Sequence, residues 1–295
     1  MLYVNPGYVE LMNGDIDGAT VNNEGKLFFY NTKNSYSLKF PETKEFWVKL
    51  NVILSEANNS RIYTFNEGDK SSGINIDANG TFNNWIQDKK EPNITPKTGL
   101  LLLGTEYEFM LHFRADSVAG LEEIYINGLL DWVYTGNIHD GDPFDKIEVQ
   151  SDSTNTLFRN LIVADFDISD YHIAPVKIQD FTTDFEKQAD NSLKATTAGQ
   201  YIAMHLDSDD LEKSMKKVVD NPEIVGVNVG AFNVGYDSSK VDALKLTVDN
   251  ADAGTTKIVN KNVAGEILLT NPASGQAWTL NELKNGTFKL VAEKV

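Results

Sequence analysis

Apolar and polar residues alternate over most of the first 178 positions, in short runs separated by Asn, Gly, Asp and Ser. Such alternation puts the apolar side chains on one face of an extended chain, so it predicts half-buried β-strands. No convincing helix fits in this part of the sequence. The expected strands cover residues 25–30, 37–40, 46–54, 61–66, 74–77, 81–86, 106–114, 122–127, 145–150 and 157–165.

Turn-forming pairs recur between these strands, at Asn13-Gly14, Asn79-Gly80, Asn127-Gly128 and Asp140-Gly141. Asn-Gly and Asp-Gly are strong hairpin signals, because these residues adopt positive φ at little cost. Many short strands joined by such turns predict an antiparallel sandwich or barrel. Residues 46–54 are the richest in β-forming residues, so we expect them in the centre of a sheet.

The pattern changes between residues 170 and 190, where we expect a domain boundary. Residues 208–219 predict a helix with Leu211 and Met215 on its apolar face. Its first turn is acidic and its last turn carries lysines, as the helix dipole favours, and Ser208 or Asp209 is the expected N-cap. Further strands are expected over residues 224–229, 243–248, 257–260, 266–270 and 287–291.

A formal charge of −17, from 43 Asp and Glu against 26 Lys and Arg, argues against a nucleic-acid partner. Nucleic-acid binding needs clustered Lys and Arg that release counterions, and the sequence contains no such cluster. Cysteine is absent, which excludes disulfides, thiolate metal sites and a Cys nucleophile. No apolar run is long enough to cross a bilayer, so we expect no membrane insertion. The first residues lack the basic and apolar segments of a classical signal peptide.

Three segments carry a resemblance to a known family: residues 107–113, Ile124-Tyr125-Ile126-Asn127-Gly128, and residues 158–165. They resemble the concanavalin A-like (LamG-like) jelly-roll lectins and glucanases. In that family a late strand reads hydrophobic-Tyr-hydrophobic-Asn-Gly, and the closing strand carries an Asn-Leu-Ile-Val type run. The resemblance covers residues 20–170 and implies a mainly β protein. We expect an antiparallel jelly-roll β-sandwich over residues 1–175 and a small α+β domain over residues 176–295.

Members of this family are mostly binding or adhesion modules, often for carbohydrate, and some are glycoside hydrolases. Proteins with such a domain and no signal peptide also resemble phage or prophage virion and tail components. The resemblance therefore implies a non-enzymatic structural or adhesion protein of a phage or prophage particle. Its partners would be other virion proteins or itself, and its location the virion, or the cytoplasm before release. A carbohydrate-binding module is the first alternative, and an atypical glycoside hydrolase or lyase is the second.

The sequence lacks the carboxylate pattern that an enzyme of this family would need. Hydrolases with this fold usually carry Glu-x-Asp-x-x-Glu on one strand, which points nucleophile and acid to the same face. The nearest candidates, Glu106 with Glu108 and Glu122 with Glu123, lack the third member. Adjacent residues of a strand face opposite sides, which separates Glu122 from Glu123. We therefore predict that the protein is not an enzyme.

Carbohydrate binding normally uses an aromatic platform beside amide or acid side chains. Two segments offer this combination: Trp85 with Asn83 and Gln87, and Trp132 with Tyr134. The alternative is that both tryptophans are partly packed into the core, because a sandwich needs large residues. Sequence leaves this choice open.

One loop has the composition of a calcium site, which is the only cofactor the sequence suggests. Asp140, Asp142 and Asp145 are closely spaced around a Gly, and calcium takes six to eight oxygen ligands. Residues 13–18 form a second oxygen-rich segment, but neither segment continues into the EF-hand pattern. The alternative is that these Asp and Gly residues simply form turns. The four histidines are isolated in sequence, so zinc is not expected.

Overall fold

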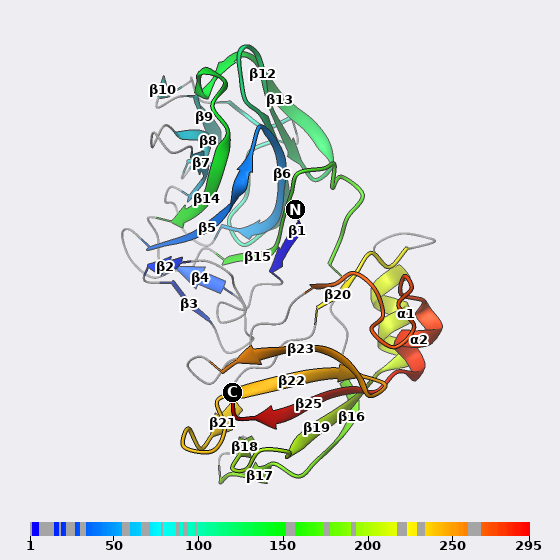
Figure 1. Ribbon diagram of the computed structural model, residues 1–295. Coiled ribbons are helices and arrows are strands. Elements are labelled where there is room, and N and C mark those ends of the chain that lie inside the picture. Colours follow the sequence, from blue (N-terminus) through cyan, green and yellow to red (C-terminus); the bar gives the residue numbers. More distant parts are fainter. Residues whose placement is uncertain are drawn as a thin grey trace. The chain divides into compact units, whose positions relative to one another are not determined.

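The computed structural model describes residues 2–5, 15–17, 19–21, 27–29, 34–54, 60–65, 71–77, 79–86, 89–90, 94–97, 99–151, 157–173, 178–189, 193–216, 223–228, 234–258 and 267–295. The chain divides into two compact units, Met1–Tyr171 and His172–Val295, which we call unit 1 and unit 2 (Figure 1).

Unit 1 contains two antiparallel sheets. Sheet A consists of β1 (Leu2–Asn5), β3 (Ala19–Val21), β4 (Leu27–Phe29), β6 (Glu45–Ile53), β11 (Glu106–Arg114), β12 (Asp116–Ile126), β13 (Leu129–Ile138) and β15 (Leu157–Ala164). Sheet B consists of β2 (Asp15–Asp17), β5 (Asn34–Thr43), β7 (Ser60–Phe65), β8 (Ser71–Ile76), β9 (Phe82–Ile86), β10 (Lys89–Lys90) and β14 (Phe144–Ser151). The order in sheet A is β13-β12-β11-β6-β15-β4-β3, with β1 paired to β15, and the order in sheet B is β10-β9-β8-β7-β14-β5-β2.

The chain passes repeatedly between the two sheets, from β5 in sheet B to β6 in sheet A, and again from β13 to β14 and back to β15. Strands that are distant in sequence therefore pair, as β6 does with both β11 and β15. This connectivity is that of an antiparallel jelly-roll sandwich. The predicted fold class, mainly β with a jelly-roll sandwich and a C-terminal α+β domain, is confirmed.

The core of unit 1 lies between the sheets and follows the alternation of the sequence. On β6 the side chains of Phe46, Val48, Leu50 and Val52 are almost completely buried. They pack with inward-facing residues of sheet B in one apolar cluster, which includes Phe82. The central position expected for residues 46–54 is confirmed, because β6 pairs on one side with β11 and on the other with β15.

Each of the ten strands expected in this part of the sequence overlaps a strand of the structure, but β13 was not expected. This strand is at the edge of sheet A and pairs only with β12 among the described residues. Its exposed residues include Leu129 and Val133, so apolar character does not alternate with burial along it. A short 3-10 helix, η2 (His139–Gly141), follows β13 directly.

Unit 2 is an α+β unit. Its main sheet, sheet C, consists of β16 (Ile178–Thr183), β19 (Tyr201–Leu206), β22 (Ala243–Val248), β23 (Ala251–Lys257) and β25 (Phe288–Glu293), in the antiparallel order β16-β19-β25-β22-β23. The smaller elements are β17 (Glu186–Lys187), β18 (Leu193–Ala195), β20 (Val227–Asn228), β21 (Val234–Tyr236), β24 (Ile267–Leu268), α1 (Ser208–Lys216) and α2 (Leu280–Asn285). Leu211 of α1 and Leu283 of α2 join the apolar core of this unit.

The helix expected over residues 208–219 is present as α1, but its N-cap differs from the prediction. The Asp207 carboxylate accepts hydrogen bonds from the backbone N–H groups of Asp209 and Asp210, both at 3.0 Å. These two donors would otherwise be left without partners in the first turn. The cap is therefore Asp207, one residue before Ser208, and the sequence prediction of Ser208 or Asp209 was wrong.

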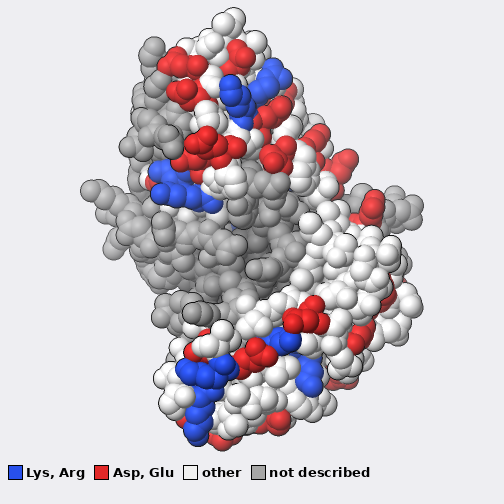
Figure 2. Space-filling model, viewed as in Figure 1, with Lys and Arg blue, Asp and Glu red and all other residues white. Residues whose placement is uncertain are grey.

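Charged side chains of both signs are interspersed on the face shown in Figure 2. The Lys and Arg residues seen there stand among Asp and Glu, as expected for an acidic, solvated surface. In the described part of the chain, neither helix has the length and apolar character needed to cross a bilayer.

Candidate functional site

The candidate site lies on the surface of sheet B that faces away from the core. Inward-facing residues of β8, β9 and β14, such as Ile74, Phe82 and Ile147, belong to the buried cluster. Because side chains alternate along a strand, the residues between them face outward. We call the surface formed by these outward residues the outer face of sheet B; it comprises Asn75, Asn83, Trp85, Lys146, Glu148 and Gln150.

Strand register places five of these residues in two rows that cross four strands. The first row runs Asn83, Asn75, Arg61 and Gln150, and the second row runs Trp85, Gly73, Tyr63 and Glu148. Gly73 has φ of 143°, which is rarely adopted by other residues. A glycine inside a strand often marks a place where a ligand or another chain segment approaches the backbone closely.

Asp77, at the end of β8, holds the amide side chains of the first row in place. Its two carboxylate oxygens accept hydrogen bonds from Asn75 Nδ2 at 2.9 Å and from Asn83 Nδ2 at 3.0 Å. One carboxylate thus fixes two neighbouring amides from different strands. Because each amide donates through nitrogen to Asp77, its carbonyl oxygen points away from that carboxylate.

The site retains unused hydrogen-bonding capacity. Asn83 is fully buried, and its Oδ1 atom has no hydrogen-bond partner in the described structure. A buried acceptor of this kind normally finds a donor, from protein, water or ligand. Trp85 lies two residues further along the same face of β9 and is half-buried. The face therefore combines an aromatic ring with an oriented amide and an unfilled acceptor.

On β14 the outer face is charged. Glu148 accepts a hydrogen bond from the Gln150 amide and lies 3.8 Å from Lys146 Nζ. Both members of this ion pair are partly buried, so solvent screens them less than it would a fully exposed pair. The outer face of sheet B thus carries a cationic, an anionic and an amide side chain in addition to Trp85.

Trp132 and Tyr134 are placed elsewhere. Their rings are nearly parallel, with centroids 6.1 Å apart, and both pack against the core cluster from edge strand β13. Sheet A, not sheet B, carries them, so the structure does not bring them together with Trp85. Core packing, the alternative considered from sequence, describes these two side chains. Gln87 lies outside the described residues.

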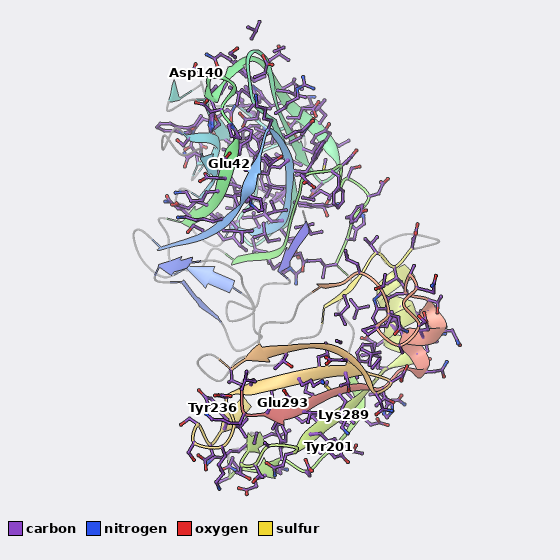
Figure 3. The ribbon with its side chains drawn as sticks, viewed as in Figure 1. Glu42, Asp140, Tyr201, Tyr236, Lys289 and Glu293 are labelled. Carbon is purple, nitrogen blue, oxygen red and sulfur yellow. The ribbon has the colours of Figure 1, made fainter. Side chains whose placement is uncertain are left out.

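The loop suggested for calcium does not assemble a ligand set. Asp140, labelled in Figure 3, has positive φ and accepts a hydrogen bond from Asn137 Nδ2 at 2.6 Å, which closes a turn. Asp142 uses its backbone N–H to cap the carbonyl of His139, and Asp145 follows on β14. In the described part of the chain, no three His, Asp or Glu side chains are arranged so that they could hold a metal ion. The turn-forming role therefore accounts for what is seen of Asp140.

A second polar cluster lies on the outward surface of sheet A. His112 Nε2 lies 2.9 Å from Glu45 Oε1, and His112 Nδ1 lies 2.9 Å from Glu123 Oε2. Tyr125 donates a hydrogen bond to the same Glu123 oxygen at 3.2 Å. Burial is the first cause that raises the pKa of Tyr125, followed by the charge of Glu123. Two carboxylates thus hold the two ring nitrogens of His112, which gives this side chain a structural role in sheet A.

The glutamates that are catalytic candidates either face opposite sides of a strand or form ion pairs. Glu123 faces outward to His112, whereas Glu122 is fully buried and contacts Asn84 of β9. Their placement on opposite sides of β12, expected from sequence, is confirmed. Glu106 forms a two-pronged ion pair with Arg159, and Glu108 lies 3.2 Å from Lys49.

A cation–π contact is found on sheet C of unit 2. Lys289 Nζ lies 4.0 Å from the centre of the Tyr201 ring, and Figure 3 shows both residues on neighbouring strands. Such a contact contributes about 0.5–1 kcal/mol when exposed. It accounts for the position of Lys289 without a ligand.

The local sequence pattern indicates Asn83 and Trp85 but not the residues that lie beside them. Asn75 and Asp77 belong to the preceding strand and the turn that follows it, and only the hairpin register brings them beside Asn83. The available signal was the pair of polar positions, Asn75 and Asn83, placed symmetrically about the Asn79-Gly80 turn. Lys146, Glu148 and Gln150 carried no motif at all.

No protein-family model matches the sequence, and no curated protein matches it significantly. Among solved structures, the chain is similar to the alginate lyase Aly36B, with 12% identity and a TM-score of 0.44 over 55% of this chain and 92% of that one. It is similar to the carbohydrate-binding module CBM66 from Bacillus subtilis, with 11% identity and a TM-score of 0.40 over 52% and 97%. It is also similar to the lectin UEA-II complexed with galactose, with 7% identity and a TM-score of 0.42 over 56% and 98%. At such identities and TM-scores, neither ligand nor activity is transferred to this chain.

Proposed function

We propose that unit 1 is a non-enzymatic carbohydrate-binding module that holds a sugar on the outer face of sheet B. The observation that carries this proposal is the amide pair of Asn75 and Asn83, fixed by Asp77 beside Trp85. A sugar presents an apolar C–H surface and a rim of hydroxyl groups. The indole of Trp85 suits the first, since aromatic rings bury large apolar area. The oriented amides suit the second, because hydroxyl groups both donate and accept. Asn75 and Asn83 are buried in the free protein, so the residues that cover them must move aside for a sugar to reach them.

The positions of the carboxylates favour binding over hydrolysis. A glycosidase needs two carboxyl groups facing the same glycosidic bond. On the outer face of sheet B, Asp77 is engaged by two amides, which leaves Glu148 as the other described carboxylate of this region. Glu122 and Glu123, considered as a catalytic pair, point in opposite directions. This arrangement supports a protein that recognises its ligand without cleaving it.

A glycan array, followed by titration calorimetry with the best ligand, tests this function. Trp85→Ala should weaken binding by about tenfold or more, because the apolar contact to the sugar is lost. Trp47→Ala is the matched control, since Trp47 is also half-buried but lies on sheet A, stacked on His112. Absence of wild-type binding to any glycan would reject the carbohydrate hypothesis. Equal losses in the two variants would reject the location.

The structural or adhesion role remains a second candidate, because apolar side chains are exposed on one loop. Leu100, Leu102 and Leu103 are 51%, 62% and 52% exposed. Lys97, which precedes them, is hydrogen-bonded to the backbone of Leu130, itself partly exposed. Exposed apolar groups of this kind mark surfaces that associate with other proteins. The origin in a phage or prophage particle stays a prediction from the sequence.

Light scattering distinguishes this second candidate from a simple binding module. If the loop mediates self-association, the wild type will form oligomers at high concentration and Leu102→Asp will reduce them. Val118→Asp is the control, because Val118 is 80% exposed but belongs to β12. A wild type that is monomeric at every concentration would contradict self-association.

A further inference from the structure

Glu122 is an acidic residue in the interior of the sandwich. It lies on β12, where the register places Phe113 of β11 and Tyr134 of β13 on either side of it. Its side chain is fully buried and reaches across to sheet B, where Asn84 Nδ2 donates a hydrogen bond to Glu122 Oε2 at 3.2 Å. This side-chain hydrogen bond thus links the two sheets through the core.

The two remaining atoms of this contact are both acceptors as long as the carboxyl is ionised. Glu122 Oε1 and Asn84 Oδ1 are buried, and neither has a hydrogen-bond partner in the described structure. A protonated carboxyl has one O–H donor. With a proton on Oε1, Glu122 can donate to Asn84 Oδ1 while Oε2 still accepts from Asn84 Nδ2. The unpaired acceptors are thereby removed, and the acid and the amide form a closed pair of hydrogen bonds.

The surroundings of Glu122 favour the protonated form. Burial raises the pKa of Glu122 to about 8, and the hydrogen bond from Asn84 acts in the opposite direction. No charged side chain contributes to this pKa. The facing groups are the ring of Phe113, the titratable phenol of Tyr134 and the Asn84 amide. Glu123, the next acidic residue of β12, faces the other surface, toward His112.

We propose that Glu122 and Asn84 form a proton-dependent clasp between sheets A and B, closed while the Glu122 carboxyl carries its proton and open once the proton is lost. Opening leaves a buried carboxylate opposite the Asn84 carbonyl oxygen, which is unfavourable without compensation. β9 is the element that responds, because Asn84 belongs to it. The clasp rests on the core contact and does not depend on carbohydrate binding.

The direction of the pH effect follows from the raised pKa. In the unfolded chain Glu122 ionises near 4.5, and in the folded chain near 8. The stabilisation from the closed clasp is therefore complete below pH 4.5 and is lost as pH rises through about 8. In an opened β9 the carboxyl reaches water and ionises normally. The opening equilibrium of β9 should accordingly rise on the order of a hundredfold between pH 6 and pH 9.

Two measurements on the full-length protein test the clasp. Infrared difference spectroscopy of the wild type should show a protonated carboxyl at pH 6.5 that disappears near pH 8, and Glu122→Gln should lack it. Hydrogen exchange, read by mass spectrometry and corrected for intrinsic rates, should show the pH-dependent opening of β9 in the wild type and a change below about threefold in Glu122→Gln. Glu123→Gln is the matched control and should behave as the wild type.

The proposal is overturned if the wild type has no protonated carboxyl at pH 6.5, or if that signal persists in Glu122→Gln. It is equally overturned if β9 opens with the same pH dependence in wild type and Glu122→Gln. The infrared measurement on the wild type decides the matter on its own if the Gln variant does not fold.

Discussion

The imidazole of His112 lies flat on the indole of Trp47, with ring centroids 4.1 Å apart and an angle of 5° between the ring planes. The two residues face each other across β11 and β6. Two parallel rings at this distance attract each other by dispersion, and a charged imidazole would add a cation–π attraction. Because Glu45 and Glu123 hold the two ring nitrogens, the imidazole cannot turn away from the indole without breaking those contacts.

This stack should be measurable as a coupling energy. We expect a double-mutant cycle with Trp47→Ala and His112→Ala to give about 1 kcal/mol of interaction free energy. Urea denaturation of the four proteins provides the measurement. A cycle between Trp47 and Lys146, which lie on different sheets, is the control and should be additive. Additive effects for Trp47 and His112 would show that the stack contributes nothing of its own.

Gly80 should tolerate substitution much less well than Gly99. Both have positive φ, of 80° and 91°, so a side chain strains either backbone by about 1–2 kcal/mol. Only at Gly80 would a Cβ atom overlap the backbone of Leu101, whose nitrogen would lie 2.8 Å away, whereas nothing lies within 4 Å at Gly99. We expect Gly80→Ala to lose about 3 kcal/mol and Gly99→Ala about 1 kcal/mol.

Thermal and urea unfolding of the two glycine variants would check this difference. Similar losses for both substitutions would mean that the 99–105 segment moves aside and does not press on the turn at Gly80. The comparison matters for the proposed site, because this turn joins β8 to β9 and sets the register of Asn75 with Asn83.

Sequence predicted the strands best where burial alternates along them. β6, β11 and β22 were expected almost as found, because the apolar side chains at alternate positions face the core of the unit to which each strand belongs. β13 was missed because it is an edge strand that is exposed on part of its length. Its Trp132 packs against the core, whereas the adjacent Val133 is exposed at the surface. Local pattern cannot separate those two roles.

The candidate site was predictable only within one strand. Asn83 and Trp85 are two residues apart and share a face by local geometry alone. Asp77 and Asn75 reach them through hairpin register, and Gln150 through a strand more than sixty residues away. The Glu122–Asn84 contact joins strands of different sheets, which no periodicity of a single strand contains. Such contacts depend on which strands pair and which sheets face each other, and a local sequence pattern does not contain this information.

The N-terminus of α2 should lose stability in acid. Thr279 and Glu282 form a reciprocal capping box. The Thr279 hydroxyl, and then its backbone N–H, donate to the Glu282 carboxylate and lower the pKa of Glu282. A lowered pKa contributes stability above pH 4.5 that disappears as pH falls through the folded value. Glu282→Gln should therefore weaken the helix at pH 7, and the gap to the wild type should close near pH 3.

Hydrogen exchange of the α2 peptide at the two pH values measures this gap. Glu223→Gln is the control, because Glu223 is an exposed glutamate of the same unit outside the capping box. Thr279→Ala should destabilise the helix by about 1 kcal/mol at pH 7. A gap between wild type and Glu282→Gln that is as large at pH 3 as at pH 7 would contradict the role of the ionised carboxylate.

Asp77 should matter more to the proposed binding face than any other single polar residue. Asp77→Ala leaves the amide nitrogens of Asn75 and Asn83 without their acceptor, and both side chains are almost fully buried. An unsatisfied buried donor costs about 1–3 kcal/mol, so the loss of stability should be about 2–4 kcal/mol. Sugar affinity should fall as well, because the amides are no longer held in one orientation.

Asp77→Asn distinguishes the effect of losing one acceptor for the two asparagine amides from the effect of losing side-chain volume at residue 77. The substituted amide keeps the volume but offers one acceptor where the carboxylate offers two, so one of the two asparagines keeps its partner. We therefore expect an intermediate loss of both stability, by urea denaturation, and affinity, by calorimetry. Gln150→Ala, at the far end of the same row, is the control and should change stability by less than about 1 kcal/mol. If Asp77→Asn binds sugar as tightly as the wild type, the amide pair does not form the recognition surface.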